Sequence, residues 1–333
     1  MTESRHRLTP RSDPGLLSLV IPTYNEAAVI PHLRARLTSF AAELAGAVEL
    51  VFVNDGSSDQ TLDLLLDWAA ADPRVKVIGL ARNFGHQAAA TAGLDLARGD
   101  AVVLIDADLQ DPPEVIHQML ARYRDGYDVV YGVRASRLGE TRFKRLTAWL
   151  FYRFMRAFIH PDLPADAGDF RLISRPCLDA LKTMRETHRF LRGMVAWVGF
   201  AQTAVRYDRR AREHGETKYP LRKMLRFAAT AAVSFSPAPL RVSLALGFAV
   251  AFLGFAVAGY AFLRYVAGYP YVSGWTTLVV LLCLIGGAIL ISIGVLGEYV
   301  GRIYEEIKGR PLYLISTTAN LDRDAGDHGD CAS

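Results

Sequence analysis

The sequence predicts an α/β domain with a doubly wound, mostly parallel sheet, followed by amphipathic interface helices and two transmembrane helices. Three observations lead to this prediction. Short apolar segments alternate with helical stretches over roughly the first 210 residues, which is typical of a doubly wound sheet. Two long uncharged segments follow near the C-terminus. The chain of 333 residues is 51% hydrophobic yet 22% charged, and its mean hydropathy is +0.16, so the apolar residues are concentrated in part of the chain.

Five short segments rich in Val, Ile and Leu are typical of strands in a parallel sheet covered on both faces. They are Leu17–Pro22, Glu49–Asn54, Val75–Ala81, Ala101–Asp106 and Asp128–Val133. Between them, apolar residues recur at the spacing of a helix, for example over residues 62–69 and 115–120. Because strands and helices alternate, we expect ligands at the carboxyl ends of the strands.

One helix start is marked by Asp111-Pro112-Pro113-Glu114. Asp is a favoured N-cap residue, Pro is favoured in the first turn, and Glu lies well beside the positive helix end. The pattern therefore predicts a helix that begins directly after Asp111.

The two uncharged segments, Val242–Leu263 and Thr276–Gly297, predict a transmembrane hairpin. Each has about 22 residues and spans roughly 33 Å as a helix, which is enough for a hydrocarbon core of about 30 Å. A pair of buried helices in a soluble core is the alternative, and the length of the uncharged segments argues against it. Glycines recur in both segments, as close helix packing in lipid requires, either within one chain or between copies in a homo-oligomer.

The charges beside the hairpin predict its orientation. The short connection holds one cation, Arg264, whereas the outer flanks hold Arg222, Lys223, Arg226, Arg241, Arg302, Lys308 and Arg310. The positive-inside rule therefore places both chain ends in the cytoplasm and the two spans in the cytoplasmic (inner) membrane. The polar N-terminal residues lack the apolar segment of a cleaved signal peptide.

Five parts of the chain are expected. They are a disordered N-terminus (1–15), a cytoplasmic α/β domain (16–219), an amphipathic interface helix (220–239), the transmembrane hairpin (240–300) and a cytoplasmic tail (301–333). Residues 220–235 combine cations with apolar residues in the manner of an interface helix. Residues 141–160 show a similar pattern, for which an ordinary helix with a cationic outer face remains open. The tail from Thr317 is polar and is expected to be disordered.

Several classes of protein are excluded by composition and motifs. Three widely spaced cysteines rule out a disulfide scaffold. A net charge of +4 is too small to suggest a nucleic-acid partner. The sequence has neither the GxxxxGK[ST] pattern of P-loop proteins nor a GxGxxG after the first strand.

Asp106-Ala107-Asp108 follows the fourth predicted strand and is the sharpest chemical signal. As the strand turns outward, both carboxylates can reach one divalent ion, and hard oxygen ligands suit Mg²⁺ or Mn²⁺ bridging a diphosphate. A solvated loop that uses Asp as a turn former remains the alternative. An α/β domain that binds a nucleotide through carboxylates and a metal favours a nucleotide-sugar transferase.

Spaced sequence blocks, in a fixed order, resemble those of one known family. The blocks are Val20–Glu26 (VIPTYNE), Val53–Asp59 (VNDGSSD), Arg82–His86 (RNFGH), Asp106–Glu114 (DADLQDPPE), Gly168–Leu172 (GDFRL) and Arg209–Tyr219 (RRAREHGETKY). With them the chain resembles the family 2 inverting glycosyltransferases. It is most similar to the polyprenyl-phosphate branch, which includes dolichol-phosphate mannosyltransferases and bacterial undecaprenyl-phosphate sugar transferases.

This resemblance extends over residues 16 to 310 and implies a GT-A-type nucleotide-sugar fold. It also implies transfer of a single hexose to undecaprenyl or other polyprenyl phosphate with inversion, and UDP-glucose is the expected donor. GDP-mannose or a UDP-aminopentose as donor stays open, and so, more remotely, does a non-catalytic membrane scaffold. The QxxRW element of processive synthases is absent from the sequence, which predicts that one sugar is added.

The resemblance also implies roles for individual residues. Those expected to hold the base and ribose of the nucleotide are Pro22, Tyr24, Glu26 and Asp55. Tyr24 could instead serve only for packing, and Asp55 could serve only turn chemistry.

The expected metal and diphosphate site comprises Asp106, Asp108 and Gln110, with Ala107 between the two carboxylates as part of the nucleotide-sugar site. Arg134 matches a family position near the phosphates. Arg212 and Lys218 match a mobile basic loop that closes on the donor diphosphate and the acceptor phosphate, although a run of cations is more often a solvated face.

Asp169 matches the position where relatives with hydroxyl acceptors keep a catalytic base. Two roles remain open for it: orienting the sugar or the basic loop, or accepting a proton. A purely structural pairing with Arg171 is the alternative to both. Because a phosphate monoester is largely ionised at pH 7, with a second pKa near ~6, the acceptor does not need a strong base.

Overall fold

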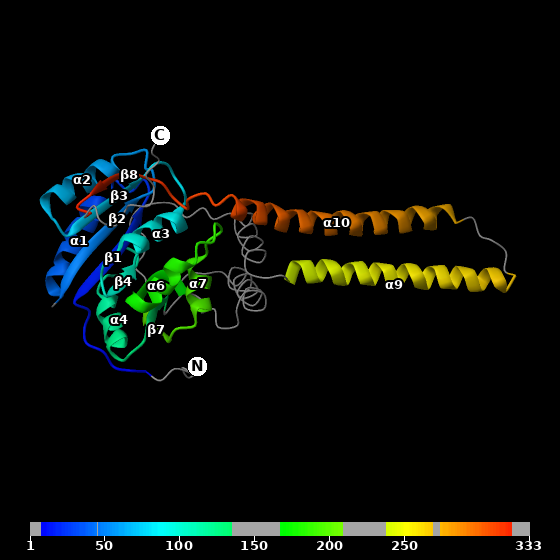
Figure 1. Ribbon diagram of the computed structural model, residues 1–333, viewed down its shortest axis with the longest axis horizontal. Helices are drawn as coiled ribbons and strands as arrows, with labels where there is room; N and C mark the ends of the chain where they lie inside the picture. Colours follow the sequence, from blue (N-terminus) through cyan, green and yellow to red (C-terminus); the bar gives the residue numbers. More distant parts are fainter. Residues whose placement is uncertain (1–7, 45, 135–166, 209–237, 269–273, 322–333) are drawn as a thin grey trace. The chain divides into compact units, whose positions relative to one another are not determined.

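The computed structural model describes residues 8–44, 46–134, 167–208, 238–268 and 274–321 (Figure 1). These residues form two compact units. The first unit contains a β-sheet with its covering helices, and the second contains two long helices, α9 and α10.

An eight-stranded mixed sheet forms the centre of the first unit, in the order β7-β5-β6-β4-β1-β2-β3-β8. The strands are β1 (Leu16–Thr23), β2 (Ala47–Asn54), β3 (Val75–Leu80), β4 (Ala101–Leu104), β5 (Val129–Arg134), β6 (Ala167–Ser174), β7 (Gln202–Tyr207) and β8 (Ile315–Ala319). Strands β3, β2, β1 and β4 are mutually parallel, as are β5 and β7. In contrast, β6 runs antiparallel to both β4 and β5, and β8 runs antiparallel to β3.

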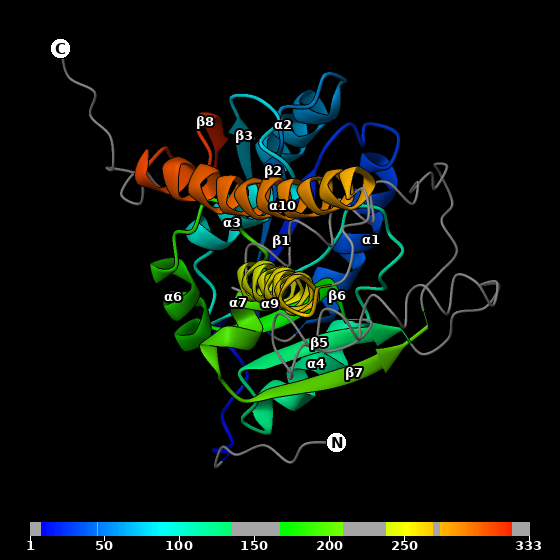
Figure 2. The same cartoon turned by 90° about the vertical axis from the view of Figure 1, so that its right-hand side faces the viewer.

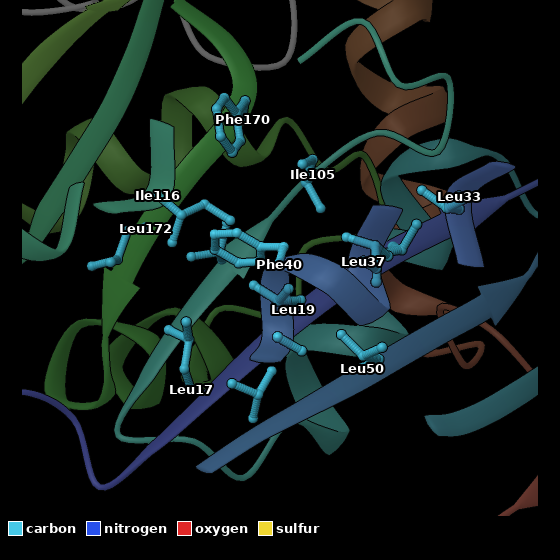
Figure 3. Packing of buried hydrophobic residues seen from close by; sticks show 14 of the residues in the cluster. Leu17, Leu19, Leu33, Leu37, Phe40, Leu50, Ile105, Ile116, Phe170 and Leu172 are labelled. Carbon is cyan, nitrogen blue, oxygen red and sulfur yellow. The ribbon is translucent and has the colours of Figure 1, made fainter. Parts of the chain in front are cut away.

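Helices cover both faces of the sheet, so the doubly wound arrangement expected from the sequence is confirmed (Figures 1 and 2). The helices of this unit are α1 (Ile30–Glu43), α2 (Thr61–Ala71), α3 (His86–Leu96), α4 (Val115–Arg124), α6 (Arg175–Thr183) and α7 (Leu191–Val198). One buried cluster joins α1, α2 and α4 to the sheet, and the other joins α3, α6 and α7 to it. In Figure 3, Phe40 of α1 lies among Leu19, Ile105 and Ile116.

The five predicted strands are all present, and their bounds differ from the expected ones by one or two residues. The difference that matters most is at β4, which ends at Leu104. Asp106 therefore lies beyond the strand, in the loop that leaves the sheet. Such a loop is free to direct both carboxylates of the acidic pair toward one side.

The prediction that Asp111 caps a helix is wrong. Helix α4 begins at Val115, and residues 112–117 form a tighter turn in which the amide of Val115 donates to the carbonyl of Pro112 at 3.1 Å. The Asp111 carboxylate is buried and accepts a hydrogen bond of 2.5 Å from the hydroxyl of Tyr207 on β7. Because this carboxylate binds a tyrosine that is distant in the sequence, Asp111 stabilises the tertiary structure and does not cap the helix.

The expected disorder from Thr317 is also wrong for the residues that follow it directly. The segment after α10 returns to the first unit and adds β8 to the edge of the sheet beside β3. Asn320 donates from its side chain to the carbonyls of Ala69 (2.7 Å) and Val75 (2.9 Å), and the Tyr313 hydroxyl donates to Asp95 at 2.8 Å. Strand β8 has no apolar periodicity, so only its pairing partner makes it a strand.

We expect deletion of residues 313–333 to destabilise the sheet unit, whereas deletion of residues 322–333 should not. The longer deletion removes β8 and the Asn320 and Tyr313 bonds, each of which contributes about 1 kcal/mol. For a unit of this size, the loss should lower the midpoint of thermal unfolding by at least about 5 °C. Thermal scans of the two truncated proteins beside the full chain measure this. Equal midpoints for all three would show that β8 does not stabilise the sheet.

The second unit consists of α9 (Ala238–Val266) and α10 (Trp275–Ile307), which contact each other. Both contain a window long and apolar enough to cross a membrane, at Leu240–Val257 with mean hydropathy 2.1 and at Val280–Ile307 with mean hydropathy 2.6. No part of either window is buried, which argues against a pair of soluble core helices. The predicted amphipathic helix at 141–160 lies outside the described residues, as does nearly all of the one at 220–239.

Candidate functional site

The loops after β1 and β2 are tied together at the carboxyl edge of the sheet. The amide of Asn25 donates to the Ser57 hydroxyl at 2.9 Å, and the amide of Ser58 donates to Oδ1 of Asn25 at 2.8 Å. The amide of Glu26 donates to the Thr61 hydroxyl at 2.8 Å. The two loops therefore form one surface, on which Tyr24 is exposed.

Asp55 holds this surface to the start of α3. Its two carboxylate oxygens accept hydrogen bonds from the amides of Phe84 (2.7 Å) and Gly85 (2.9 Å). Burial raises the pKa of Asp55, and the two amides and the nearby His86 partly oppose that rise. The residue is only 3% exposed. The structure thus shows a positioning role for Asp55, and its contact with a nucleotide stays a prediction.

Gly56, next to Asp55, allows the loop after β2 to lie close to the loop after β3. Its φ of +62° lies in the left-handed region, and a Cβ built there would lie 2.4 Å from the carbonyl carbon of Arg82. Any other residue would therefore push the loop after β2 away from the loop after β3. The close approach places the Arg82–His86 block beside Asp55.

The acidic loop after β4 contains the predicted metal residues. Ala107 and Gln110 are buried, whereas Asp106 and Asp108 are partly exposed. The amide of Gln110 donates to Oδ1 of Asp108 at 3.2 Å. Leu109 has a φ of +56°, an uncommon conformation for a residue with a branched side chain, and it turns the chain sharply directly after the acidic pair.

Sheet register brings Asp169 opposite this acidic loop. Leu104 of β4 pairs with Arg171 of the antiparallel strand β6. Asp106 lies two residues beyond Leu104, and Asp169 lies two residues before Arg171, so both residues lie at the same end of this strand pair, and both carboxylates lie beside His86. The sequence matched Asp169 to a family motif but did not place it beside Asp106.

Three basic side chains surround the Asp169 carboxylate. Arg192 of α7 donates from Nε to Oδ1 at 2.7 Å and from Nη2 to Oδ2 at 3.1 Å. Nε2 of His86 lies 3.5 Å from Oδ2 of Asp169 and 3.7 Å from Oδ1 of Asp106. The buried guanidinium of Arg171 is more distant, with Nη2 at 3.8 Å from Oδ1. Arg171, whose pairing with Asp169 was the structural alternative, is therefore the most distant of the three, and Arg192 makes the shortest contacts.

The two carboxylates differ strongly in acidity. Burial raises the pKa of Asp106 to about 6, and the negative charges of Asp169, Asp111 and Asp108 contribute to the rise, which His86 opposes. Burial acts in the same direction on Asp169. There, however, hydrogen bonds from His86 and Arg192 and the charges of the two arginines hold the pKa far below its usual range.

This electrostatic pattern suits a cation beside Asp106. An ionised Asp106 among other carboxylates is unfavourable, and a divalent ion would offset that repulsion. Among the residues described, no group of three or more His, Cys, Asp or Glu side chains is arranged to hold a metal ion. Asp106, Asp108 and Gln110 offer oxygen atoms of the kind that a hard divalent ion prefers, and their role as its ligands stays a prediction.

Three predicted residues of the phosphate site cannot be placed. Arg134 is the last residue of β5, and its side chain is outside the described part of the structure. Arg212 and Lys218 lie within residues 209–237, which are likewise outside it. The described site thus contains the loops after β1 and β2, the acidic loop and the Asp169 cluster, which consists of Asp169, His86, Arg171 and Arg192.

Comparison with known proteins identifies the two parts of the chain. The model of glycosyl transferase family 2 matches residues 18–181, and that of the GtrB C-terminal hairpin matches residues 238–303. A glycosyltransferase of Bacillus subtilis (strain 168), YkcC, is 45% identical and aligns over 92% of this chain and 94% of its own. The chain belongs to glycosyltransferase family 2.

Other relatives of this family 2 glycosyltransferase carry more specific names. A prophage bactoprenol glucosyl transferase homolog of Escherichia coli (strain K12) is 39% identical over 90% of this chain and 98% of its own. The bactoprenol glucosyl transferase of Shigella phage SfII is 40% identical over 90% of this chain and 97% of its own. The predicted enzyme class and the GT-A-type fold are therefore confirmed.

Two residues of the described site of this glycosyltransferase, His86 and Arg192, have roles that its sequence did not predict. His86 closed one of the family blocks but was given no role, and Arg192 carried no signal at all. Nothing in the local pattern around Arg192 distinguishes it from the neighbouring Arg185 and Arg189. Only the packing of α7 against the sheet brings it to Asp169.

Proposed function

We propose that this enzyme transfers one hexose from a nucleotide diphosphate sugar, with UDP-glucose as the donor, to undecaprenyl or another polyprenyl phosphate. One observation supports it most directly: an acidic loop suited to a metal-bound diphosphate occurs in the same chain as two exposed helices of membrane length. The names of the relatives agree with a lipid phosphate acceptor and a glucosyl donor.

Charge explains why the described residues suit this reaction. The acceptor phosphate is largely ionised at pH 7 and can attack the anomeric carbon without a strong base. Electrostatic stabilisation of the departing nucleoside diphosphate is then the main requirement. A single in-line displacement of this kind inverts the anomeric configuration.

A divalent metal, Mg²⁺ or Mn²⁺, is part of this proposal. Asp106, Asp108 and Gln110 would hold it, and when bound it would stabilise negative charge on the diphosphate. The nucleoside part would be held by Pro22 at the end of β1 and by Tyr24, Glu26 and Asp55 in the loops that follow β1 and β2. Arg134, Arg212 and Lys218 would contact the phosphates.

We also propose that the protein is a two-span protein of the cytoplasmic membrane, with both chain ends in the cytoplasm. The chain leaves the sheet unit before α9 and returns to it after α10 as β8. If both helices cross the membrane, their outer ends therefore share one side with the sheet unit. The cations that flank the hairpin favour the cytoplasm for that side.

The orientation predicts opposite results from two reporters. After Ser333, a fluorescent protein should be active and alkaline phosphatase inactive, because that position is expected in the cytoplasm. Beside Ser273, alkaline phosphatase should be active and the fluorescent protein inactive. Fluorescence and phosphatase activity of the four fusions are the measurement. Both positions on the same side would show that one of the helices does not cross.

Lipid transfer with the purified full chain tests the reaction itself. Undecaprenyl phosphate is incubated with Mn²⁺ and, in separate reactions, labelled UDP-glucose, GDP-mannose and a UDP-aminopentose, and the label in extracted lipid is counted. We expect lipid labelling from UDP-glucose that depends on undecaprenyl phosphate. Labelling only from another donor would correct the sugar and keep the reaction. No labelling from any donor would contradict transfer and favour a non-catalytic scaffold.

A further inference from the structure

A second hydrogen bond, in addition to the contacts of Asp169, joins α3 to α7. Gln87, next to His86 at the start of α3, accepts a hydrogen bond of 3.0 Å from the amide of Leu191, through its side-chain oxygen. Leu191 is next to Arg192 at the start of α7. Two adjacent residues of α3 are thus joined to two adjacent residues of α7, once directly and once through Asp169.

The packing of α7 restricts the movement of Leu191 and Arg192. Leu191, Met194 and Val195 are almost fully buried in the cluster shared with α3 and α6. Arg192 lies on the opposite, half-exposed side of the same helix turn, with its side chain 35% exposed. The backbone of α7 is therefore fixed by apolar contacts, and the guanidinium points from a rigid base toward Asp169.

The two parallel hydrogen bonds of Arg192 determine how Asp169 can act. A guanidinium paired through two nitrogens to both oxygens of a carboxylate restricts its rotation and occupies its best acceptor positions. The same carboxylate lies beside His86, which in turn lies beside Asp106. The order Arg192, Asp169, His86, Asp106 is thus a continuous chain of alternating basic and acidic groups.

We propose that Arg192 is a positioning residue of the transfer site: it fixes Asp169 as an anchor for His86 beside the acidic loop, so that Asp169 does not serve as a proton acceptor. This inference rests on the proposed function, because it concerns a reaction whose acceptor arrives ionised. It rejects one of the two roles that the sequence leaves open for Asp169, that of a proton acceptor. It also implies that the shape of the guanidinium matters in addition to its charge.

Four variants test the proposal: Arg192→Gln, Arg192→Lys, Asp169→Asn and the double variant with Arg192→Gln and Asp169→Asn. We expect Arg192→Gln to lower kcat for lipid transfer at least 30-fold, while UDP affinity, measured by calorimetry, changes less than 3-fold. Arg192→Lys keeps the charge but loses the two parallel bonds, so it should recover only part of kcat. Because Arg192 acts through Asp169, adding Arg192→Gln to Asp169→Asn should lower kcat by less than a further 3-fold.

Arg185→Gln is the matched control. Arg185 donates to Asp95 at 2.8 Å, and Asp95 is about as buried as Asp169, with 13% and 11% of the side chains exposed. Removing this pair should leave kcat within 2-fold of the wild type. Thermal unfolding of every variant shows whether the fold is retained, and the lysine variant provides the test if the glutamine variant does not fold.

Several results would overturn the inference. They are a kcat for Arg192→Gln within 2-fold of the wild type, full recovery by Arg192→Lys, additive losses in the double variant, or an equal loss in Arg185→Gln. Each of these results can be interpreted only if the wild-type protein transfers sugar to the lipid. A wild type that labels no lipid from any donor would instead overturn the proposed function, and this inference with it.

Discussion

Replacing Asp108 by Asn is expected to lower the turnover of lipid transfer by at least ~10²-fold, the size of effect seen when one electrostatic stabiliser of a transition state is removed. The substitution keeps the size of the side chain but removes the charge that a divalent ion requires. Asp106→Asn should act in the same direction, because that carboxylate lies among Asp108, Asp111 and Asp169. The rate of label transfer to undecaprenyl phosphate, at saturating Mn²⁺ and donor, is the measurement.

Two controls accompany this experiment. Asp125→Asn makes the same chemical change at an exposed residue that ends α4 and should leave turnover within 2-fold. Removal of divalent ions with EDTA should abolish wild-type transfer, and added Mg²⁺ or Mn²⁺ should restore it. Full activity in EDTA would show that the acidic loop does not act through a metal.

For the basic loop, we expect Arg212→Ala and Lys218→Ala to lower kcat sharply while they weaken nucleotide binding less than ~10-fold, or about 1.4 kcal/mol. The site must hold the donor diphosphate and the acceptor phosphate together, and cations have to screen their mutual repulsion. The nucleotide alone would keep its contacts with the strand-end loops and the metal. Calorimetric titration of UDP, beside the lipid-transfer assay on the same protein, separates the two effects.

Arg122→Ala serves as the control for the basic loop. It removes an exposed cation of α4 that pairs with Asp125 on the surface, so neither kcat nor UDP affinity should change more than 2-fold. Near-normal transfer by both loop variants would show that Arg212 and Lys218 form only a solvated face. A loss of UDP affinity equal to the loss of kcat would place them in nucleotide binding and contradict the two-anion arrangement.

Local patterns were sufficient for the parallel half of the sheet. Strands β1 to β5 are mostly apolar because both faces of the sheet are covered, and that property is visible in the sequence. Strands β6, β7 and β8 were not predicted. Strand β6 is central and pairs antiparallel with β4 and β5, whereas β7 and β8 lie at the two edges of the sheet and have partly exposed side chains. An edge strand of this kind is defined by its neighbour, and the neighbour of β8 is far from it in the sequence.

The acidic loop and the Asp169 cluster illustrate the same difference. Asp106 and Asp108 could be predicted because strand-end carboxylates in an α/β domain are adjacent in the sequence and have a known use. Asp169 reaches them only through the antiparallel register of β4 and β6. Arg192 reaches Asp169 only because α7 packs against the sheet beside α3.

The sequence by itself determined the first five strands and the alternation of strands with helices, the two membrane-length segments, the family blocks and the acidic pair, since each depends on residues close together in the chain. The tertiary structure alone decided that the segment after α10 returns to the sheet, that Asp111 binds Tyr207 instead of a helix end, and that Asp169 is held mainly by Arg192. These three outcomes share a physical reason. The two partners in each contact are distant in the sequence, and they come within contact distance only when the sheet has formed.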